Sequence, residues 1–313
     1  SVPGFFSLAA SVGPAGIGQS TAAQQVNSVF SRVGVSWKRL AFLEATGRND
    51  WSSTLAKDQR SYFYPSVASS FVISELLPDT KNWLDLLKLR GAWTLSKRPA
   101  NIYEINSSYS ISAATWGTLN GAGVPSNLYS PTIAPTSSET YETGMQGILF
   151  KNRVMVDVSY YTKRVFDRIT TVGLTAASGY GGIVTNSKEE ITRRGWEVIL
   201  NGTPIKSKDW KLDIGINWST FASYYTKLDP VYSAVKPWVK VGERSDHFIS
   251  RDFLRDPSGN IIHNGSGRPI VSQYDTKFGY YDPKFIWGTN SNLRYKNFSL
   301  FVSFDGVNGG LAN

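Results

Sequence analysis

The stretch WKLDIGINWS, residues 210–219, decides the fold, because apolar and polar side chains alternate in it without a break. Trp210, Leu212, Ile214, Ile216 and Trp218 fall on one side, and every residue between them is polar or glycine. Successive side chains of a β-strand point to opposite faces, so the pattern predicts a strand with one apolar and one polar face. A tryptophan at each end of the apolar face is typical of a strand that crosses a membrane.

The same alternation recurs in four further segments. Their apolar members are Val29, Val33, Val35 and Trp37; Val154, Val156, Val158 and Tyr160; Trp196, Val198 and Leu200; and Phe298, Leu300, Val302 and Phe304. Together with the turn signals between them, these segments indicate about ten strands. We therefore expect an all-β chain.

The connections between strands are of two kinds. Tight turns rich in lysine and arginine are expected at residues 37–40, 150–153, 206–209 and 295–297, and each would close an antiparallel hairpin. Long stretches rich in Ser, Thr, Gly and Pro separate the hairpins at residues 94–138 and 228–281. Short turns at one end and long loops at the other predict an antiparallel transmembrane β-barrel wall with short periplasmic turns and long extracellular loops. One helix is expected at residues 79–87, where Asp79 or Thr80 could cap it.

Composition excludes several classes of site. The chain of 313 residues has no cysteine, which excludes disulfides, thiol nucleophiles and cysteine-ligated metals, and its two histidines leave little for a metal centre. We therefore expect no metal site and no cofactor. The net charge is +9, but many of the cations lie in the short turns. They predict a positive rim that meets anionic head groups, so a nucleic-acid partner is not expected.

Several strings in succession resemble the barrel of SusC/RagA-type TonB-dependent outer-membrane transporters of Bacteroidota. They include RNDWSSTL at 48–55, YFYPSVASSFVISE at 62–75, LKLRGAW at 87–93, SETYETG at 138–144 and YDPKF at 281–285. The resemblance implies a 22-strand barrel, of which this chain would supply about ten strands. Residues 1–27 would be a leading strand or loop segment and residues 28–313 a partial barrel. The plug domain and the terminal strands of the family are not recognised.

The resemblance also implies a function. The intact protein would import oligosaccharides or peptides across the outer membrane of a Gram-negative cell, without acting as an enzyme. It would work with a SusD-like surface lipoprotein and draw energy from the TonB–ExbB–ExbD complex through an N-terminal part not recognised here. Outer-membrane lipid or lipopolysaccharide would surround it. Two alternatives stay open: a soluble carbohydrate-binding β-sandwich, and a surface adhesin domain.

Aromatic residues of the long loops are the candidate ligand-binding residues. They are Trp116, Tyr129, Tyr180, Trp238, Tyr274 and Tyr280. Each ring could stack on a sugar ring or a peptide side chain, and packing within the loops explains each of them equally well. No catalytic residue is expected.

Three motifs that suggest other chemistry have simpler structural interpretations. The adjacent Ser245, Asp246 and His247 cannot form a hydrolase triad through their own side chains. The paired acids at 139 and 142 and at 189 and 190 are interpreted as solvated or lumen-facing charges. Asp256 and Asn260 could ligate calcium, but a plain turn held by a proline and a glycine is favoured.

Overall fold

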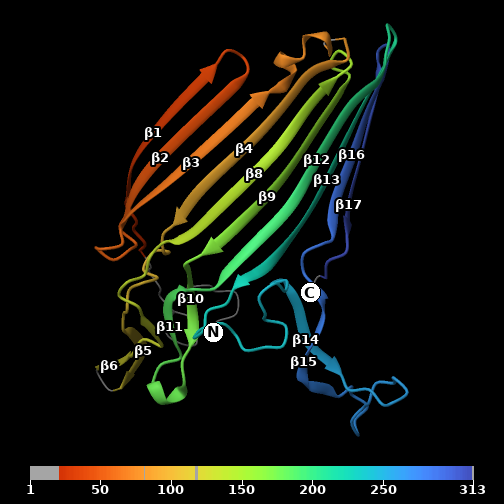
Figure 1. The fold of residues 1–313 in the computed structure, drawn as a ribbon. Helices are drawn as coiled ribbons and strands as arrows, with labels where there is room; N and C mark the ends of the chain where they lie inside the picture. Colours follow the sequence, from red (N-terminus) through yellow and green to blue (C-terminus); the bar gives the residue numbers. More distant parts are fainter. Residues whose placement is uncertain (1–20, 81, 117–118, 312–313) are drawn as a thin grey trace, which may run out of the picture.

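The computed structural model describes residues 21–80, 82–116 and 119–311, and it forms a curved wall of strands with loop structures at one end (Figure 1). The wall is one antiparallel sheet of ten strands in the order β1-β2-β3-β4-β8-β9-β12-β13-β16-β17. The strands are β1 (Val26–Trp37), β2 (Ala41–Ser52), β3 (Ser61–Val72), β4 (Leu84–Arg98), β8 (Thr136–Leu149), β9 (Val154–Phe166), β12 (Glu190–Lys206), β13 (Trp210–Lys227), β16 (Phe285–Tyr295) and β17 (Phe298–Asn308). The expected all-β class and the expected wall of about ten strands are confirmed.

The tight turns lie where the sequence predicts them. Left-handed backbone angles at Lys38, Lys151, Asn152 and Lys296 reverse the chain between paired strands. In β12–β13 the pairing runs from Glu190 opposite Lys227 to the end near the turn at 206–209. The lysine-rich turns therefore gather at one end of the wall, which we call the short-turn end.

The long connections contain small sheets of their own. They are β10 (Arg168–Gly173), β11 (Gly182–Ser187) and β7 (Asn127–Tyr129) in one sheet, β14 (His247–Phe253) with β15 (Val271–Tyr280), and β5 (Ser110–Trp116) with β6 (Leu119–Gly123). All of them lie at the end of the wall opposite the short turns, which we call the long-loop end (Figure 1). Leu55, Tyr62 and Ala100 form a small buried core there.

The prediction of a helix at residues 79–87 is wrong. Among the described residues of this region, the helical turns are the single 3₁₀ turns η2 (Ile73–Leu76) and η3 (Pro78–Thr80), and a third, η4 (Ala176–Ser178), lies in a loop. From Leu84 onward the chain is strand β4, with Leu87 opposite Gly147 of β8. In the described part of the chain, no helix has the length and apolar character needed to cross a membrane.

The first strand begins at Val26, close to the expected start of the barrel at residue 28. Residues 1–20 of the expected leading segment lie outside the described residues. The division at residue 27 therefore stays a prediction.

Candidate functional site

The strand register sorts the side chains of the wall into two faces. Residues directly opposite each other on antiparallel strands point to the same side of the sheet. Trp218 lies opposite both Val198 and Trp287, and Ile216 lies opposite Leu200. We call the side that carries these residues the apolar face, and the other side the polar face.

Aromatic rings mark both ends of the apolar face. Toward the long-loop end they are Trp93, Tyr141, Tyr160, Trp196, Trp218 and Trp287, and toward the short-turn end they are Trp37, Trp210, Tyr295 and Phe298. Ring centroids are 4.9 Å apart in the Tyr160–Trp196 pair and 4.3 Å apart in the Trp210–Tyr295 pair. Trp210 and Trp218 are eight residues apart, or about 26 Å at ~3.3 Å per residue. At the tilt of about 40° that is usual for strands of outer-membrane barrels, this length spans about 20 Å along the membrane normal, comparable with the ~25 Å height of the apolar band.

The polar face carries ion pairs between neighbouring strands. Arg90 of β4 reaches across β8 and donates two hydrogen bonds, of 3.0 and 2.7 Å, to Asp157 of β9. Its guanidinium also lies 3.8 Å from Glu142 of β8. On β2, Asp50 accepts hydrogen bonds from Arg48 at 2.8 Å and from the Tyr64 hydroxyl at 2.7 Å. Charges paired in this way suit a surface that faces water or a polar cargo rather than lipid.

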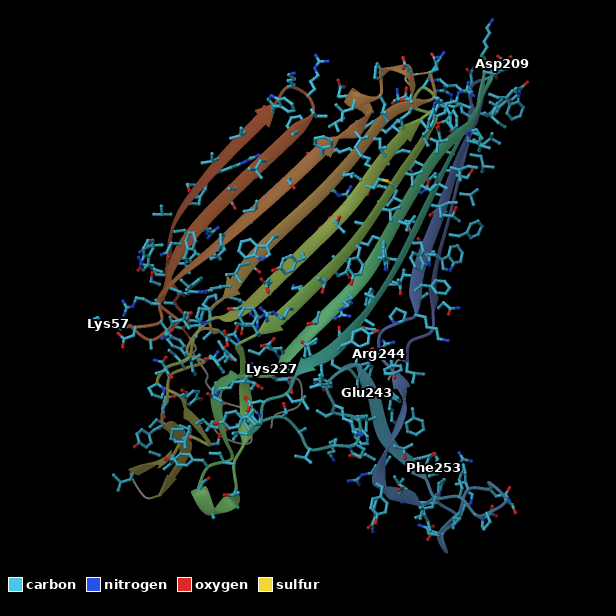
Figure 2. All side chains as sticks on the ribbon, in the orientation of Figure 1. Lys57, Asp209, Lys227, Glu243, Arg244 and Phe253 are labelled. Carbon is cyan, nitrogen blue, oxygen red and sulfur yellow. The ribbon has the colours of Figure 1, made fainter. Side chains whose placement is uncertain are left out.

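Figure 2 shows how the side chains are distributed between the two ends. Asp209 lies at the short-turn end, whereas Lys57 and Lys227 lie at the other end of the wall. Arg244 and Phe253 belong to the segment that carries β14 and β15, and Phe253 lies out along this hairpin, away from the wall.

The six candidate aromatic residues fall on three separate small sheets and their flanking loops. Trp116 ends β5, where it pairs with Leu119. Tyr129 pairs with Val184 in the β7–β11 ladder, and Tyr180 lies just before β11. Tyr274 on β15 is 80% exposed.

Trp238 and Tyr280 meet at His247, at the base of the β14–β15 hairpin. His247 is buried; its Nε2 lies 3.0 Å from the Trp238 carbonyl oxygen, and its ring lies 5.5 Å from the Tyr280 ring. The Arg244 guanidinium and the Lys277 ammonium lie 4.0 and 4.6 Å from the centre of the Tyr280 ring. Tyr280 is therefore already in contact with two cations and a histidine, which favours a packing role over a free stacking surface.

Two titratable groups hold this hairpin base. Burial alone would raise the pKa of Asp246, but hydrogen bonds from the Arg244 side chain and the Asp282 backbone N–H outweigh it and lower the pKa. Burial lowers the pKa of His247, and the nearby Lys277 ammonium acts in the same direction. Among the described residues, the Nδ1 of His247 is the one buried side-chain polar atom without a hydrogen-bond partner.

Acidification is expected to loosen the hairpin base. Because the folded state holds His247 neutral, its stabilising contribution is complete above pH ~6.5, the usual histidine pKa, and is lost as the pH falls through the lowered pKa. Hydrogen exchange over residues 244–282, corrected for intrinsic rates, should be faster at pH 5.5 than at pH 7.5. His247→Gln should remove this difference. If the variant keeps the difference in exchange between the two pH values, protonation of His247 is not the cause of that difference. Asp246 does not interfere with the test, because its lowered pKa places its titration in a more acidic range.

The motifs that suggested other chemistry have structural explanations. The Asp246 carboxylate binds Arg244 rather than His247, so these residues do not form a relay toward Ser245. At the calcium candidate, Asp256 accepts hydrogen bonds from the backbone N–H groups of Ser258 and Asn260, as the favoured plain turn requires. The described residues contain no cluster of three or more His, Cys, Asp or Glu that could hold a metal ion.

The paired acids are likewise divided between different partners. Glu142 lies near Arg90 on the polar face, whereas Glu139 binds Arg164 on the other. Glu190 also binds Arg164, and its chain neighbour Glu189 lies 3.4 Å from Arg168 instead. Neither pair therefore forms two carboxylates that converge on one point.

Several known proteins are similar to this chain in sequence. The chain is 27% identical to the TonB-dependent receptor P26 of Formosa agariphila, over 91% of this chain and 32% of the relative. It is 23% identical to the TonB-dependent receptor SusC of Bacteroides thetaiotaomicron, over 88% of this chain and 30% of the relative. The chain thus spans about a third of the length of these relatives.

Solved structures share the fold. The RagAB peptide importer in its closed-closed state superimposes with a TM-score of 0.75 and 20% identity, over 90% of this chain and 33% of the importer chain. A family model described as TonB dependent receptor-like, beta-barrel matches residues 4–310. The chain belongs to the β-barrel family of TonB-dependent receptors, and SusC and the RagAB importer are among the proteins that it resembles.

Proposed function

We propose that this chain forms part of the wall and the outer loops of an importer that takes up oligosaccharides or peptides across the outer membrane. The observation that carries the proposal is the two-faced wall. One face is apolar and edged by aromatic rings at both ends, and the other carries paired charges such as Arg90 and Asp157. A wall of this kind separates lipid from a polar lumen through which a polar cargo passes.

The two ends of the wall give the proposed orientation. The short lysine-bearing turns face the periplasm, and the small sheets of the long connections face the outside. Cargo would first meet the outside loops, where Tyr274 is the most exposed of the candidate aromatic residues that the structure describes. Trp116, Tyr129, Tyr180 and Trp238 stay candidates for stacking on a sugar ring or a peptide side chain, and Tyr280 is the weakest of the six because cations already lie against its ring.

Import of this type depends on partners. A SusD-like surface lipoprotein would close over the outside loops, and the TonB–ExbB–ExbD complex would supply energy through a part of the protein other than the one described. The similarity to SusC and to the RagAB peptide importer supports both partners. No covalent chemistry is required of these residues, because the proposed work is binding and passage.

The test uses the whole protein in its native cell. Deleting its gene should abolish growth on, or uptake of, one class of oligosaccharide or peptide, and the wild-type gene should restore it only while TonB is present. The protein should fractionate with the outer membrane. Recovery of the folded protein from the aqueous fraction would instead support the soluble β-sandwich, and unchanged uptake of every oligosaccharide and peptide tried would contradict the proposal.

A further inference from the structure

Charged side chains lie on the apolar face just beyond its aromatic edge at the long-loop end. Arg164 is four residues beyond Tyr160 on β9, and Arg194 is two residues from Trp196 on β12, so each shares a face with its aromatic neighbour. Lys97 continues the row on β4, two strands from β9. At the end of β13, Lys227 pairs with Glu190, which lies at the start of β12. We call these four cations, with the acids Glu139 and Glu190, the outward basic belt.

The acids of the belt are held inside it. Glu139 accepts hydrogen bonds from the Trp93 indole at 3.0 Å, the Tyr141 hydroxyl at 2.9 Å and Arg164 at 2.8 Å. Glu190 lies 3.2 Å from Arg164 and 3.3 Å from Lys227. Both carboxylates are therefore bound by groups of the protein itself, and these contacts hold the Arg164 guanidinium in place.

Three of the four cations, Arg164, Arg194 and Lys227, are more exposed than the acids. The side chains of Glu139 and Glu190 are each 17% exposed, against 44% for Arg164 and 55% for Lys227. Arg194 is also exposed, and within the described part of the chain neither Arg194 nor Lys97 forms an ion pair. Four cations against two acids leave the belt with a net charge of +2.

The depth of the outward basic belt in the membrane indicates which kind of molecule would bind it. An arginine or lysine on the lipid side of a barrel costs about 2–4 kcal/mol at the bilayer midplane and close to nothing at the interface, so the belt lies at the level of the head groups. The apolar face that continues from it would be covered by acyl chains. A molecule that covers both surfaces therefore needs acyl chains and an anionic head group.

We propose that the outward basic belt binds the phosphate of a glycolipid in the outer leaflet, with Arg164 and Arg194 as its principal phosphate contacts. The proposal rests on the proposed outer-membrane location. Arginine suits this role because its planar guanidinium offers several N–H donors to phosphate oxygens. Aromatic rings such as Tyr160 and Trp196 would lie beside the glycolipid where its head group meets its acyl chains.

The experiment compares two pairs of variants that differ by one position along each strand. Arg164→Gln with Arg194→Gln removes two belt cations. The matched control, Lys163→Gln with Arg193→Gln, removes two cations from the polar face of the same strands. The whole protein, purified in detergent and shown to be folded by its resistance to SDS at room temperature, is titrated with monophosphoryl lipid A in native mass spectrometry.

The belt pair should weaken lipid A binding by about 25-fold, at about fivefold for each cation near a lipid surface, and the control pair should leave it unchanged. Lipid A without its phosphate should bind the wild type about as weakly as phosphorylated lipid A binds the belt pair. Equal effects of the two pairs, or no effect of either, would overturn the proposal. So would tight binding of lipid A that lacks phosphate.

Further measurements distinguish binding of the lipid from binding of a phosphate ion alone. Inorganic phosphate should bind far more weakly than lipid A, and equal affinity would show an anion site rather than a lipid site. If the double variant does not fold, Arg194→Gln alone decides the outcome, because no described ion pair depends on Arg194. Cell fractionation reports the outer-membrane location independently, so a mislocated protein contradicts the proposed function and a correctly located protein without lipid A binding contradicts only the belt.

Discussion

Replacing Ile214 by arginine in the whole protein should destabilise the folded barrel by about 2–4 kcal/mol, the cost of an arginine on the lipid side near the bilayer midplane. Ile214 lies on the apolar face of β13, four residues from Trp210 and four from Trp218, and therefore midway between the two aromatic edges. The effect should appear as a lower urea midpoint for unfolding from detergent micelles or liposomes.

The matched control is Asn217→Arg on the same strand. Asn217 lies opposite Ile199 and Gly288 on the polar face, where an arginine keeps its contact with water. Its cost should stay below about 1 kcal/mol, the usual size of a surface substitution effect. A folded, detergent-free and water-soluble Ile214→Arg protein would show that this face is not in lipid.

The second large effect is expected at Gly195, where two strands approach closely. A Cβ added there would lie 2.7 Å from the Thr220 carbonyl oxygen and 2.7 Å from the Tyr161 hydroxyl. The Tyr161 side chain could move, but the backbone carbonyl cannot move without disturbing the β12–β13 ladder. Gly195→Val should therefore cost about 1–3 kcal/mol, the range for overpacked sites, although valine is a favourable residue in strands.

Gly147→Val on β8 provides the comparison for this prediction. A Cβ at Gly147 would meet nothing within 4 Å, and its neighbours on the apolar face would leave valine in contact with lipid. This variant should be neutral or slightly stabilising in the same urea titration. Similar losses at the two glycines would mean that backbone entropy rather than the close approach determines the result.

Strand number, hairpin turns and the two-faced pattern could be predicted from local sequence. Trp210, Ile214 and Trp218 define a face by their spacing alone, because the period of a strand is fixed at two residues. The turn at residues 206–209 follows from the change to Lys and Ser between two alternating segments. Such signals need no knowledge of distant partners.

The helix prediction was wrong because the apolar residues of this short segment fit the period of a helix and the period of a strand equally. Trp83, Leu84 and Leu87 share a helical face, but Leu87, Leu89 and Trp93 also share a strand face. The strand is the stable choice, because β8 pairs with β4 from Leu84 onward and β3 adds pairing on the other side from Lys88. Pairing between strands thus outweighs the local helical pattern.

The outward basic belt and the polar-face ion pairs could not be predicted in this way. Arg90 and Asp157 are 67 residues apart, and they meet only because β4, β8 and β9 lie side by side. Likewise, Glu139 and Glu142 look like a pair in the sequence, yet they point to opposite faces and bind different arginines. The one available clue is the parity of each position relative to an aromatic residue on the same strand, as for Tyr160 and Arg164.

The most direct test of the two-faced wall is a scan of single cysteines along β12 and β13 in the whole protein, since these 313 residues contain no cysteine of their own. Each position carries a nitroxide spin label, and its collision rates with oxygen, which concentrates in lipid, and with a water-soluble nickel complex are measured in liposomes. Positions 198, 200, 214 and 216 should favour oxygen, and positions 197, 199, 213 and 217 should favour the nickel complex, giving a period of two. Protection of the first set from both reagents, as when a second sheet covers that face, would contradict the account.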